Sequence, residues 1–234
     1  MASNYVVERN RQSLHTHAIT FAGDGVRLSG QIDYPRASNN TNSKGNVPLV
    51  FVLPHAGCNT RDTFTHYART ALSNGYAVFR WDKRGTGRSG AGGRGSAMQD
   101  AVLAYETALD QPRVDTNKVV ILAQSDATTM LGKSFGLYAR LAHPAGVILA
   151  GNMLDDKEVL AIQAPTLIIS GENDWTDWHM YVKAAVAAHN AAYDHGASGF
   201  VADGADRTLM TEDGGHRSIH FAAQRVMGDW LATL

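Results

Sequence analysis

A serine flanked by small residues is the feature of this sequence best suited to chemistry. Residues 123–127 read Ala-Gln-Ser-Asp-Ala, after an apolar run at Lys118–Leu122 and before a segment with helical periodicity. A strand, a sharp turn with a central serine and a helix form a nucleophile elbow, whose crowded backbone presents the hydroxyl to a substrate carbonyl. The residues two positions away must be small, as Ala123 and Ala127 are. Ser125 is therefore a candidate nucleophile, and helix capping is the alternative.

The elements that would position this serine are predicted from the apolar pattern. Short runs rich in Val, Ile and Leu recur along the chain, separated mostly by segments that could each carry a helix, which indicates a mostly parallel sheet buried on both faces. A Gly-Asp-Gly turn signal at 23–25 predicts an antiparallel hairpin ahead of them. The predicted strands are His17–Phe21, Val26–Asp33, Val47–Leu53, Ala77–Trp81, Lys118–Leu122, Gly146–Ala150, Thr166–Ser170 and a last one near Gly199–Ala202.

Helices are predicted between and after the strands, where apolar residues recur at three- and four-residue spacing. With 234 residues and no linker-like segment, we expect one α/β domain over residues 1–234. Only residues 151–165 separate two of the predicted strands, too few for a lid domain. The predicted helices are Asp62–Asn74, Ser96–Leu109, Ala127–Leu141, Trp178–Ala192 and His220–Leu234.

Two more segments carry patterned glycines directly after predicted strands. Residues 53–58 read Leu-Pro-His-Ala-Gly-Cys, and residues 81–89 read Trp-Asp-Lys-Arg-Gly-Thr-Gly-Arg-Ser. Together with the Ser125 segment, and in the same order, they resemble the His-Gly loop, the Asp-x-Arg-Gly-x-Gly-x-Ser loop and the elbow of the α/β-hydrolase superfamily. The resemblance covers nearly the whole chain. It implies the α/β-hydrolase fold: a mostly parallel central sheet with an N-terminal antiparallel hairpin, helices on both faces and no lid domain.

The resemblance also implies an oxyanion hole beside the serine. Attack on an ester carbonyl builds negative charge on oxygen, and prepositioned backbone amides stabilise that charge. One donor would be the N–H of Asp126. The second would come from the loop residues Ala56, Gly57 or Cys58, with His55 beside them. The loop at 81–89 is expected to have a structural role only.

The triad acid is also implied by the resemblance. Residues 171–174, Gly-Glu-Asn-Asp, follow a predicted strand and are similar to the superfamily's Gly-x-x-Asp. Asp174 would then orient the base and stabilise it once protonated. Glu172 and Asp177 are the nearby alternatives.

The triad base is where the sequence departs from the superfamily pattern. The histidine should follow the last strand in a phrase such as Gly-Ala-Asp-His, but residues 204–207 read Gly-Ala-Asp-Arg. The guanidinium of Arg207 stays protonated and cannot accept the serine proton. Residues 212–216, Glu-Asp-Gly-Gly-His, offer His216 instead, if the glycine-flanked loop folds back to the serine. We expect His216 to be the base, with a degenerate triad as the alternative.

The composition limits the kinds of partner and compartment that are expected for this protein. The 21 Lys and Arg residues nearly balance the 22 Asp and Glu residues, so charge gives no case for nucleic acid or an anionic membrane as a partner. Cys58 is the only cysteine, so an internal disulfide is excluded. The polar Met1–His17 segment lacks a signal-peptide pattern. We expect a soluble, cytoplasmic protein without a membrane span. His216 and His220 are four residues apart without a zincin glutamate, so no metal is expected and no cofactor is implied.

The predicted reaction is hydrolysis of a small carboxylic ester through an acyl-enzyme on Ser125. Trp175, Trp178, His55 and Arg207 could line the substrate pocket. A thioester is the close alternative substrate, because the Pro-His-Ala-Gly phrase resembles that of some thioesterases. A protein of another class, namely a lyase, isomerase or binding protein that has lost the triad base, is the second hypothesis.

Overall fold

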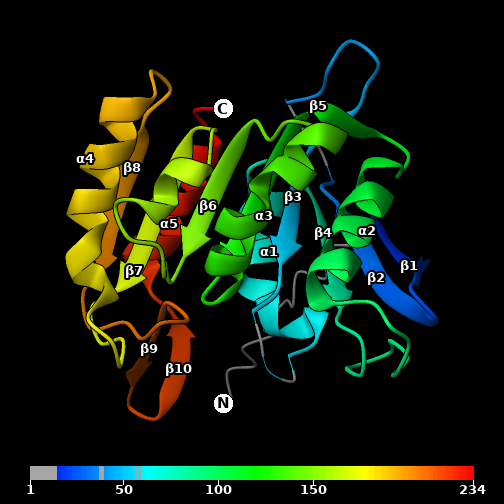
Figure 1. Ribbon diagram of the computed structural model, residues 1–234, viewed down its shortest axis with the longest axis horizontal. Coiled ribbons are helices and arrows are strands. Elements are labelled where there is room, and N and C mark those ends of the chain that lie inside the picture. The colour runs from blue at the N-terminus through cyan, green and yellow to red at the C-terminus, as the bar shows by residue number, and fades with distance from the viewer. Residues whose placement is uncertain (1–14, 37–39, 56, 58) are drawn as a thin grey trace, which may run out of the picture.

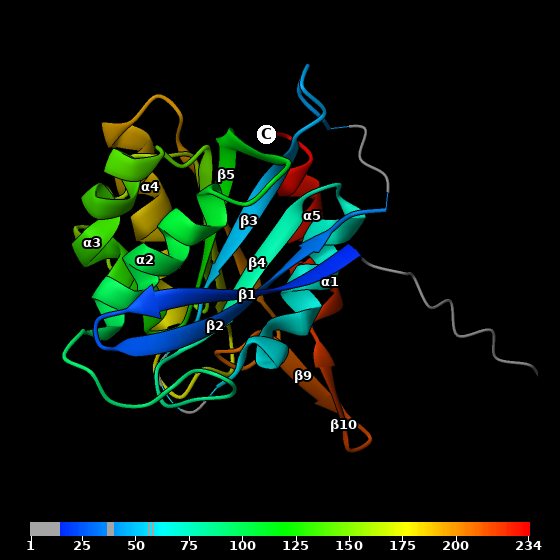
Figure 2. The same cartoon turned by 90° about the vertical axis from the view of Figure 1, so that its right-hand side faces the viewer.

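A mixed eight-stranded sheet forms the centre of the protein in a computed structural model that describes residues 15–36, 40–55, 57 and 59–234 (Figure 1). The strand order is β1-β2-β4-β3-β5-β6-β7-β8. β2 pairs antiparallel with both β1 and β4, and the other pairs are parallel. Figure 2 views the sheet from its β1–β2 edge. The strands are β1 (His15–Gly23), β2 (Val26–Tyr34), β3 (Val47–Leu53), β4 (Ala77–Asp82), β5 (Val114–Gln124), β6 (Gly146–Ala150), β7 (Thr166–Gly171) and β8 (Ala197–Ala202).

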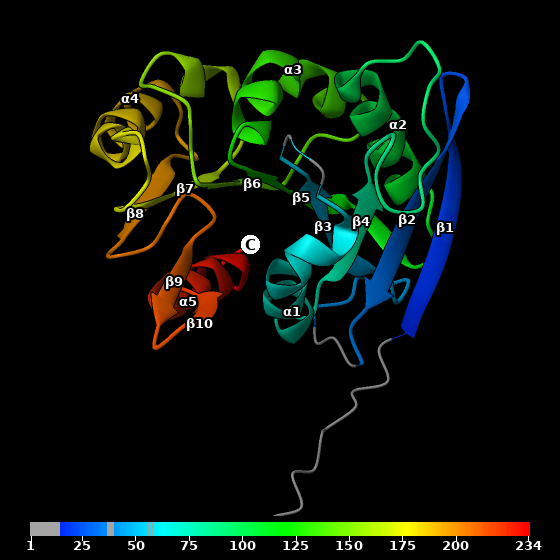
Figure 3. The same cartoon turned by 90° about the horizontal axis from the view of Figure 1, so that it is seen from below.

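Helices cover both faces of the sheet (Figure 3). α2, α3 and α4 pack on one face, and α1 and α5 pack on the other. The predicted fold class is confirmed. The helices are α1 (Thr65–Ser73), α2 (Ala97–Leu109), α3 (Ala127–Leu141), α4 (Val182–Ala192) and α5 (Phe221–Leu231), with short 3-10 turns η1 (Arg61–Phe64), η2 (Glu158–Ala161) and η3 (Trp178–Tyr181).

The alternation of side chains along the central strands explains why helices are needed on both faces. In β3, Phe51 and Leu53 belong to the core under α2 and α3, whereas Val50 and Val52 belong to the core under α1 and α5. Every residue of β3 is buried. Since apolar side chains emerge on both faces, each face must be removed from water by its own layer of helices.

A small hairpin near the C-terminus was absent from the sequence-based prediction. β9 (Met210–Asp213) and β10 (His216–Ile219) pair antiparallel outside the main sheet and precede α5 (Figure 1). In the segment expected to be too short for a lid, residues 151–165, η2 is the only helical element. None of the described helices combines the length and the apolar character needed to cross a bilayer.

The parallel strands bring the chemistry-bearing loops together. β3 to β8 all run parallel to one another, and only the β1–β2 hairpin adds antiparallel pairs to the main sheet. The carboxyl ends of β3 to β8 therefore meet at one edge of the sheet. Ser125 follows β5 and Asp174 follows β7, and Arg207 lies beyond β8. Ligand sites in α/β sheets form in such a place, outside the carboxyl ends of the strands.

Candidate functional site

Ser125 occupies a sharp turn between β5 and α3. Its backbone has φ of 57°, in the left-handed region that residues with a Cβ rarely adopt. The N–H of Ser125 donates to the carbonyl of Ala150 at 2.8 Å, which ties the turn to the end of β6. Ala123 and Ala127 are fully buried on either side, where larger side chains would meet the core. This is the geometry of a nucleophile elbow.

The hydroxyl of Ser125 does not cap the helix. Asp126 is the N-cap residue of α3, and no side-chain cap hydrogen bond is present there. The Ser125 Oγ instead donates to the thioether Sδ of Met153 at 3.8 Å, a weak acceptor. The Oγ1 of Thr128 supports both residues, since it donates to the Ser125 carbonyl at 2.7 Å and accepts from the Met153 N–H at 3.0 Å. The helix-cap alternative for Ser125 is therefore wrong.

Asp174 forms a buried ion pair with Arg207. The Arg207 Nε donates to both carboxylate oxygens, at 3.0 and 2.8 Å, and its Nη2 lies 2.7 Å from Oδ1. The two side chains are only 1% and 9% exposed. The same guanidinium hydrogen bonds to the hydroxyl of Thr176 and stacks over the ring of Trp175, 4.1 Å from its centroid. The carboxylate expected to orient a histidine is thus occupied by an arginine.

The backbone of Arg207 packs close to the serine elbow. A Cβ added to Gly151 would lie 2.1 Å from the Arg207 carbonyl oxygen, so the two chain segments touch. Gly151 directly follows Ala150, whose carbonyl accepts the Ser125 N–H. Arg207 therefore stands where the sequence pattern of the superfamily would put the base, and its charge prevents that role.

His216 does not reach this site, and its expected role as the base is corrected here. It opens β10, opposite Asp213, and its side chain is exposed. The β9–β10 hairpin projects away from the main sheet (Figure 1). Gly214 and Gly215 have φ of 55° and 80°, which suits a two-residue hairpin turn and extends the loop outward instead of folding it back. Within the part of the chain that the structure describes, no hydrogen bond joins His216 to Ser125 or Asp174.

Comparison with known proteins finds similarity at the level of the fold. No protein-family model and no curated protein sequence matches the chain. Solved structures do match over nearly the whole chain.

One is a dienelactone hydrolase-like promiscuous phosphotriesterase, P91, from metagenomic libraries, with 18% identity, a TM-score of 0.66 and coverage of 94% of this chain and 98% of that chain. Another is XC6422 from Xanthomonas campestris, an α/β serine hydrolase without a lid (15% identity, TM-score 0.62, 93% and 92% covered). A third is Est1E from Butyrivibrio proteoclasticus with bound ferulic acid (13%, 0.63, 92% and 96%).

The chain has the α/β-hydrolase fold. Its loop at 81–89 has the structural role expected from the sequence. The buried carboxylate of Asp82 accepts the backbone N–H of Arg61 at 2.8 Å and that of Arg88 at 3.0 Å. Gly87 passes so close that an added Cβ would lie 2.5 Å from this carboxylate. These hydrogen bonds hold the loop at 81–89 against the start of η1, which follows the segment at 53–58 in the chain.

The loop expected to supply an oxyanion-hole donor is described only in part. Ala56 and Cys58, two of the three candidate donors, lie outside the described residues, while Gly57 has φ of 88°. The other expected donor is the backbone N–H of Asp126. The carboxylate of the same residue lies 3.4 Å from the Nδ1 of His55. That contact joins the loop after β3 to the elbow after β5.

The residues expected to line a pocket separate into two groups. Trp175 is 82% exposed and supports Arg207, and Trp178 packs against Tyr181 in η3. His55, in contrast, lines a cavity on the α1 side of the elbow. Trp175 and Trp178 therefore belong to the surface beside Asp174.

The alternative acids lie in other surroundings. Glu172 accepts the backbone N–H of Gly204 at 2.9 Å, which lowers its pKa. Asp177 is the N-cap residue of η3, and its side chain makes no cap hydrogen bond there. Asp174 is the acidic residue that meets Arg207.

Two other histidines, His189 and His220, serve the fold. His189 is buried and its Nε2 hydrogen bonds with the carbonyl of Ile162 at 2.9 Å, while burial lowers its pKa. His220 caps α5 by accepting the N–H of Ala223 at 3.1 Å. Among the residues that the structure describes, no group of three His, Cys, Asp or Glu side chains is arranged to hold a metal ion.

Proposed function

We propose that the protein is a small-molecule hydrolase that takes the acyl group of a carboxylic ester onto Ser125, with Arg207 in the place of the triad base. The observation that carries the proposal is the conformation of Ser125. A residue with a Cβ at φ of 57° is strained by about 1–2 kcal/mol, and glycine would avoid that cost. Within the described residues, the hydroxyl caps no backbone group, and its hydrogen bond to the Met153 thioether is weak, which favours a chemical role.

The mechanism follows from this arrangement. Ser125 Oγ attacks the ester carbonyl, and the oxyanion is held by the N–H of Asp126 and a second N–H from the loop at 56–58. Arg207 cannot take the serine proton, so the proton passes to water. Collapse of the tetrahedral intermediate breaks the ester C–O bond, and the alcohol leaves with a proton returned from water. A water molecule then attacks the acyl-serine, which releases the carboxylic acid and restores the Ser125 hydroxyl. A positioned base contributes about 10²- to 10⁴-fold to the rate. Turnover is therefore expected to be slower by that factor than with an imidazole at position 207.

The substrate class is supported by the fold and by the short segment between β6 and β7. Est1E is a structure with ferulic acid, and P91 is described as dienelactone hydrolase-like, so proteins of similar fold bind or act on small molecules. Residues 151–165 carry only η2, so no lid domain is inserted between β6 and β7. A thioester remains the close alternative, because residues 54–57 read Pro-His-Ala-Gly.

A second candidate, a binding protein or non-hydrolytic enzyme, is favoured by the ion pair of Asp174 with Arg207. An aspartate held in two hydrogen bonds by a guanidinium is not free to orient a catalytic histidine. In this case Ser125 would only bind the ligand.

Turnover of p-nitrophenyl acetate distinguishes the two. The wild type should hydrolyse it slowly but faster than Ser125→Ala. Arg207→His should raise kcat at least tenfold, because a histidine there can pair with Asp174 and accept the serine proton. Arg207→Lys is the matched control that keeps the charge and should give no gain. A wild type indistinguishable from Ser125→Ala, with no gain from Arg207→His, would favour the binding protein.

A further inference from the structure

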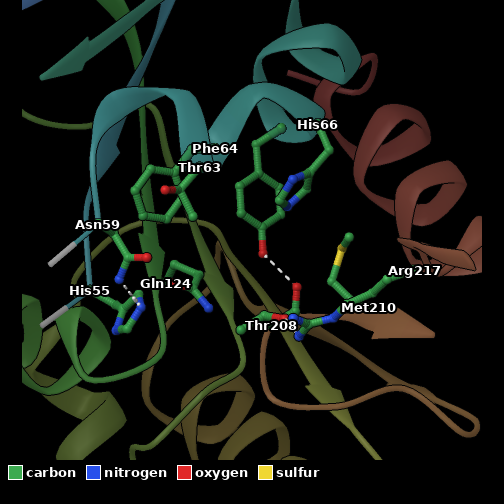
Figure 4. A pocket seen from close by; sticks show the side chains of 10 residues that line it. His55, Asn59, Thr63, Phe64, His66, Gln124, Thr208, Met210 and Arg217 are labelled. Carbon is green, nitrogen blue, oxygen red and sulfur yellow. Dashed lines mark hydrogen bonds between the residues drawn. The ribbon is translucent and has the colours of Figure 1, made fainter. Parts of the chain in front are cut away.

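A cavity of about 190 Å³ lies between α1, the end of β5 and the β9–β10 hairpin (Figure 4). Phe64, Tyr67 and Met210 give it apolar walls. Its size exceeds that of an engineered apolar cavity of about 150 Å³ that binds benzene. The cavity can therefore hold a ligand of about the size of a single substituted ring.

Two buried nitrogens at this cavity lack hydrogen-bond partners. Gln124 is only 2% exposed, and its Nε2 has no partner among the described residues. The Nε2 of His66 is likewise buried and unpartnered within the described chain. Figure 4 shows the Gln124 side chain between His55 and Thr208. Because a buried polar group without a partner is costly, a ligand atom that accepts from these nitrogens would be stabilising.

The charges around the cavity favour an acceptor over a donor. None of the described lining residues is an aspartate or glutamate, whereas Arg217 lies at the wall. Asp206, the nearby carboxylate, is already paired with Arg217. The pKa of His66 is lowered to about 4 by burial and by the charge of Arg69, so its ring is neutral at pH 7. Among the described lining residues an ammonium ligand would find no carboxylate, and a carboxylate ligand would find several donors.

We propose that this cavity binds a small monocarboxylate. The carboxylate accepts hydrogen bonds from the amide of Gln124 and from the Nε2–H tautomer of His66. The apolar body of the ligand lies against Phe64 and Tyr67. Ser125 is not among the described residues that line the cavity, so the inference does not rest on Ser125 reacting with an ester.

Sodium benzoate is the probe, titrated into the full chain and followed by NMR of the Gln124 side-chain amide and the His66 ring. Saturable shifts of both signals are expected. Gln124→Met should weaken binding at least tenfold, since the charge-assisted hydrogen bond is lost at similar side-chain volume. Gln124→Glu should abolish binding by repulsion. Ser125→Ala is the matched control and should bind benzoate as the wild type does.

Ligands of similar shape but different charge test whether the cavity selects a carboxylate. Benzyl alcohol should bind at least tenfold more weakly than benzoate, and benzylamine should not bind. If the Gln124 variants fail to fold, His66→Asn is used, and the same tenfold loss is expected. Benzoate that shifts neither signal, or binds equally well to the wild type and to Gln124→Met or His66→Asn, would overturn the proposal. Loss of benzoate binding in Ser125→Ala would also overturn it, because the ligand would then sit at the elbow.

Discussion

Removing Arg207 alone should destabilise the protein strongly. In Arg207→Met, the carboxylate of Asp174 loses all three guanidinium contacts at 2.7–3.0 Å. Only its longer contacts to the N–H and hydroxyl of Thr176, at 3.2 and 3.4 Å, remain. Breaking a buried pair in this way costs about 3–5 kcal/mol, because an uncompensated charge stays in the interior.

The loss is large enough for ordinary unfolding experiments. In a chain of this size each kcal/mol moves Tm by about 2–4 °C, so Tm should fall by about 6–20 °C. The stacking of Arg207 on the exposed Trp175 adds about 0.5–1 kcal/mol to the loss. Tm can be followed by circular dichroism, and urea unfolding followed by the same signal gives the free energy of unfolding.

The double variant tests whether the pair is responsible. Asp174→Leu should also be destabilising, since it leaves Arg207 buried without its partner. Replacing both, in Arg207→Met with Asp174→Leu, should restore stability to within about 1–2 kcal/mol of the wild type, because no charge then remains unpaired. Single losses that simply add in the double variant would refute the reasoning, since the two side chains would then act independently.

Two further predictions concern stability. The pKa of His66 is about 4 in the folded state and about 6.5 in the unfolded state. As pH falls below 6.5, the unfolded state binds a proton that the folded state does not. The free energy of unfolding present above pH 6.5 therefore decreases as pH falls toward 4. Between pH 7 and 5 the wild type should lose about 2 kcal/mol more than His66→Gln in urea unfolding, and equal losses would contradict this cause. Gly151→Ala should cost about 2–4 kcal/mol, because φ is 66° and the new Cβ would meet the Arg207 carbonyl oxygen at 2.1 Å. Gly136→Ala, with open space around it in α3, is the control and should be neutral or stabilising in thermal melts; similar losses in both variants would refute the steric argument.

The buried strands and the elbow could be predicted from sequence because local signals fix them. The apolar runs of β3 (Val47–Leu53) and β6 (Gly146–Ala150) end at residues that must leave the core, so their predicted bounds match the structure. The helix after Ser125 also has its predicted bounds, Ala127–Leu141. Burial on two faces leaves little freedom in such segments.

The ion pair at the base position could not be predicted, because it depends on tertiary contacts. The sequence identified Arg207 as a departure from the superfamily pattern, but the ion pair with Asp174 forms between loops that are 33 residues apart. His216 was expected in a loop that folds back. The Gly214-Gly215 pair is in fact a hairpin signal, and the short strands on either side are too brief and too exposed to carry a clear apolar alternation. Reading that pair as a hairpin turn would have identified β9 and β10.

The central claim, that Ser125 takes an acyl group while Arg207 stands in the place of the base, is tested most directly by intact-protein mass spectrometry with peptide mapping after incubation with p-nitrophenyl acetate. Because no imidazole assists deacylation, the acyl-enzyme should accumulate, with a single acetyl group on the peptide that contains Ser125. Ser125→Ala should remain unlabelled. An unmodified wild-type chain, or an acetyl group carried at another residue in both proteins, would contradict the account.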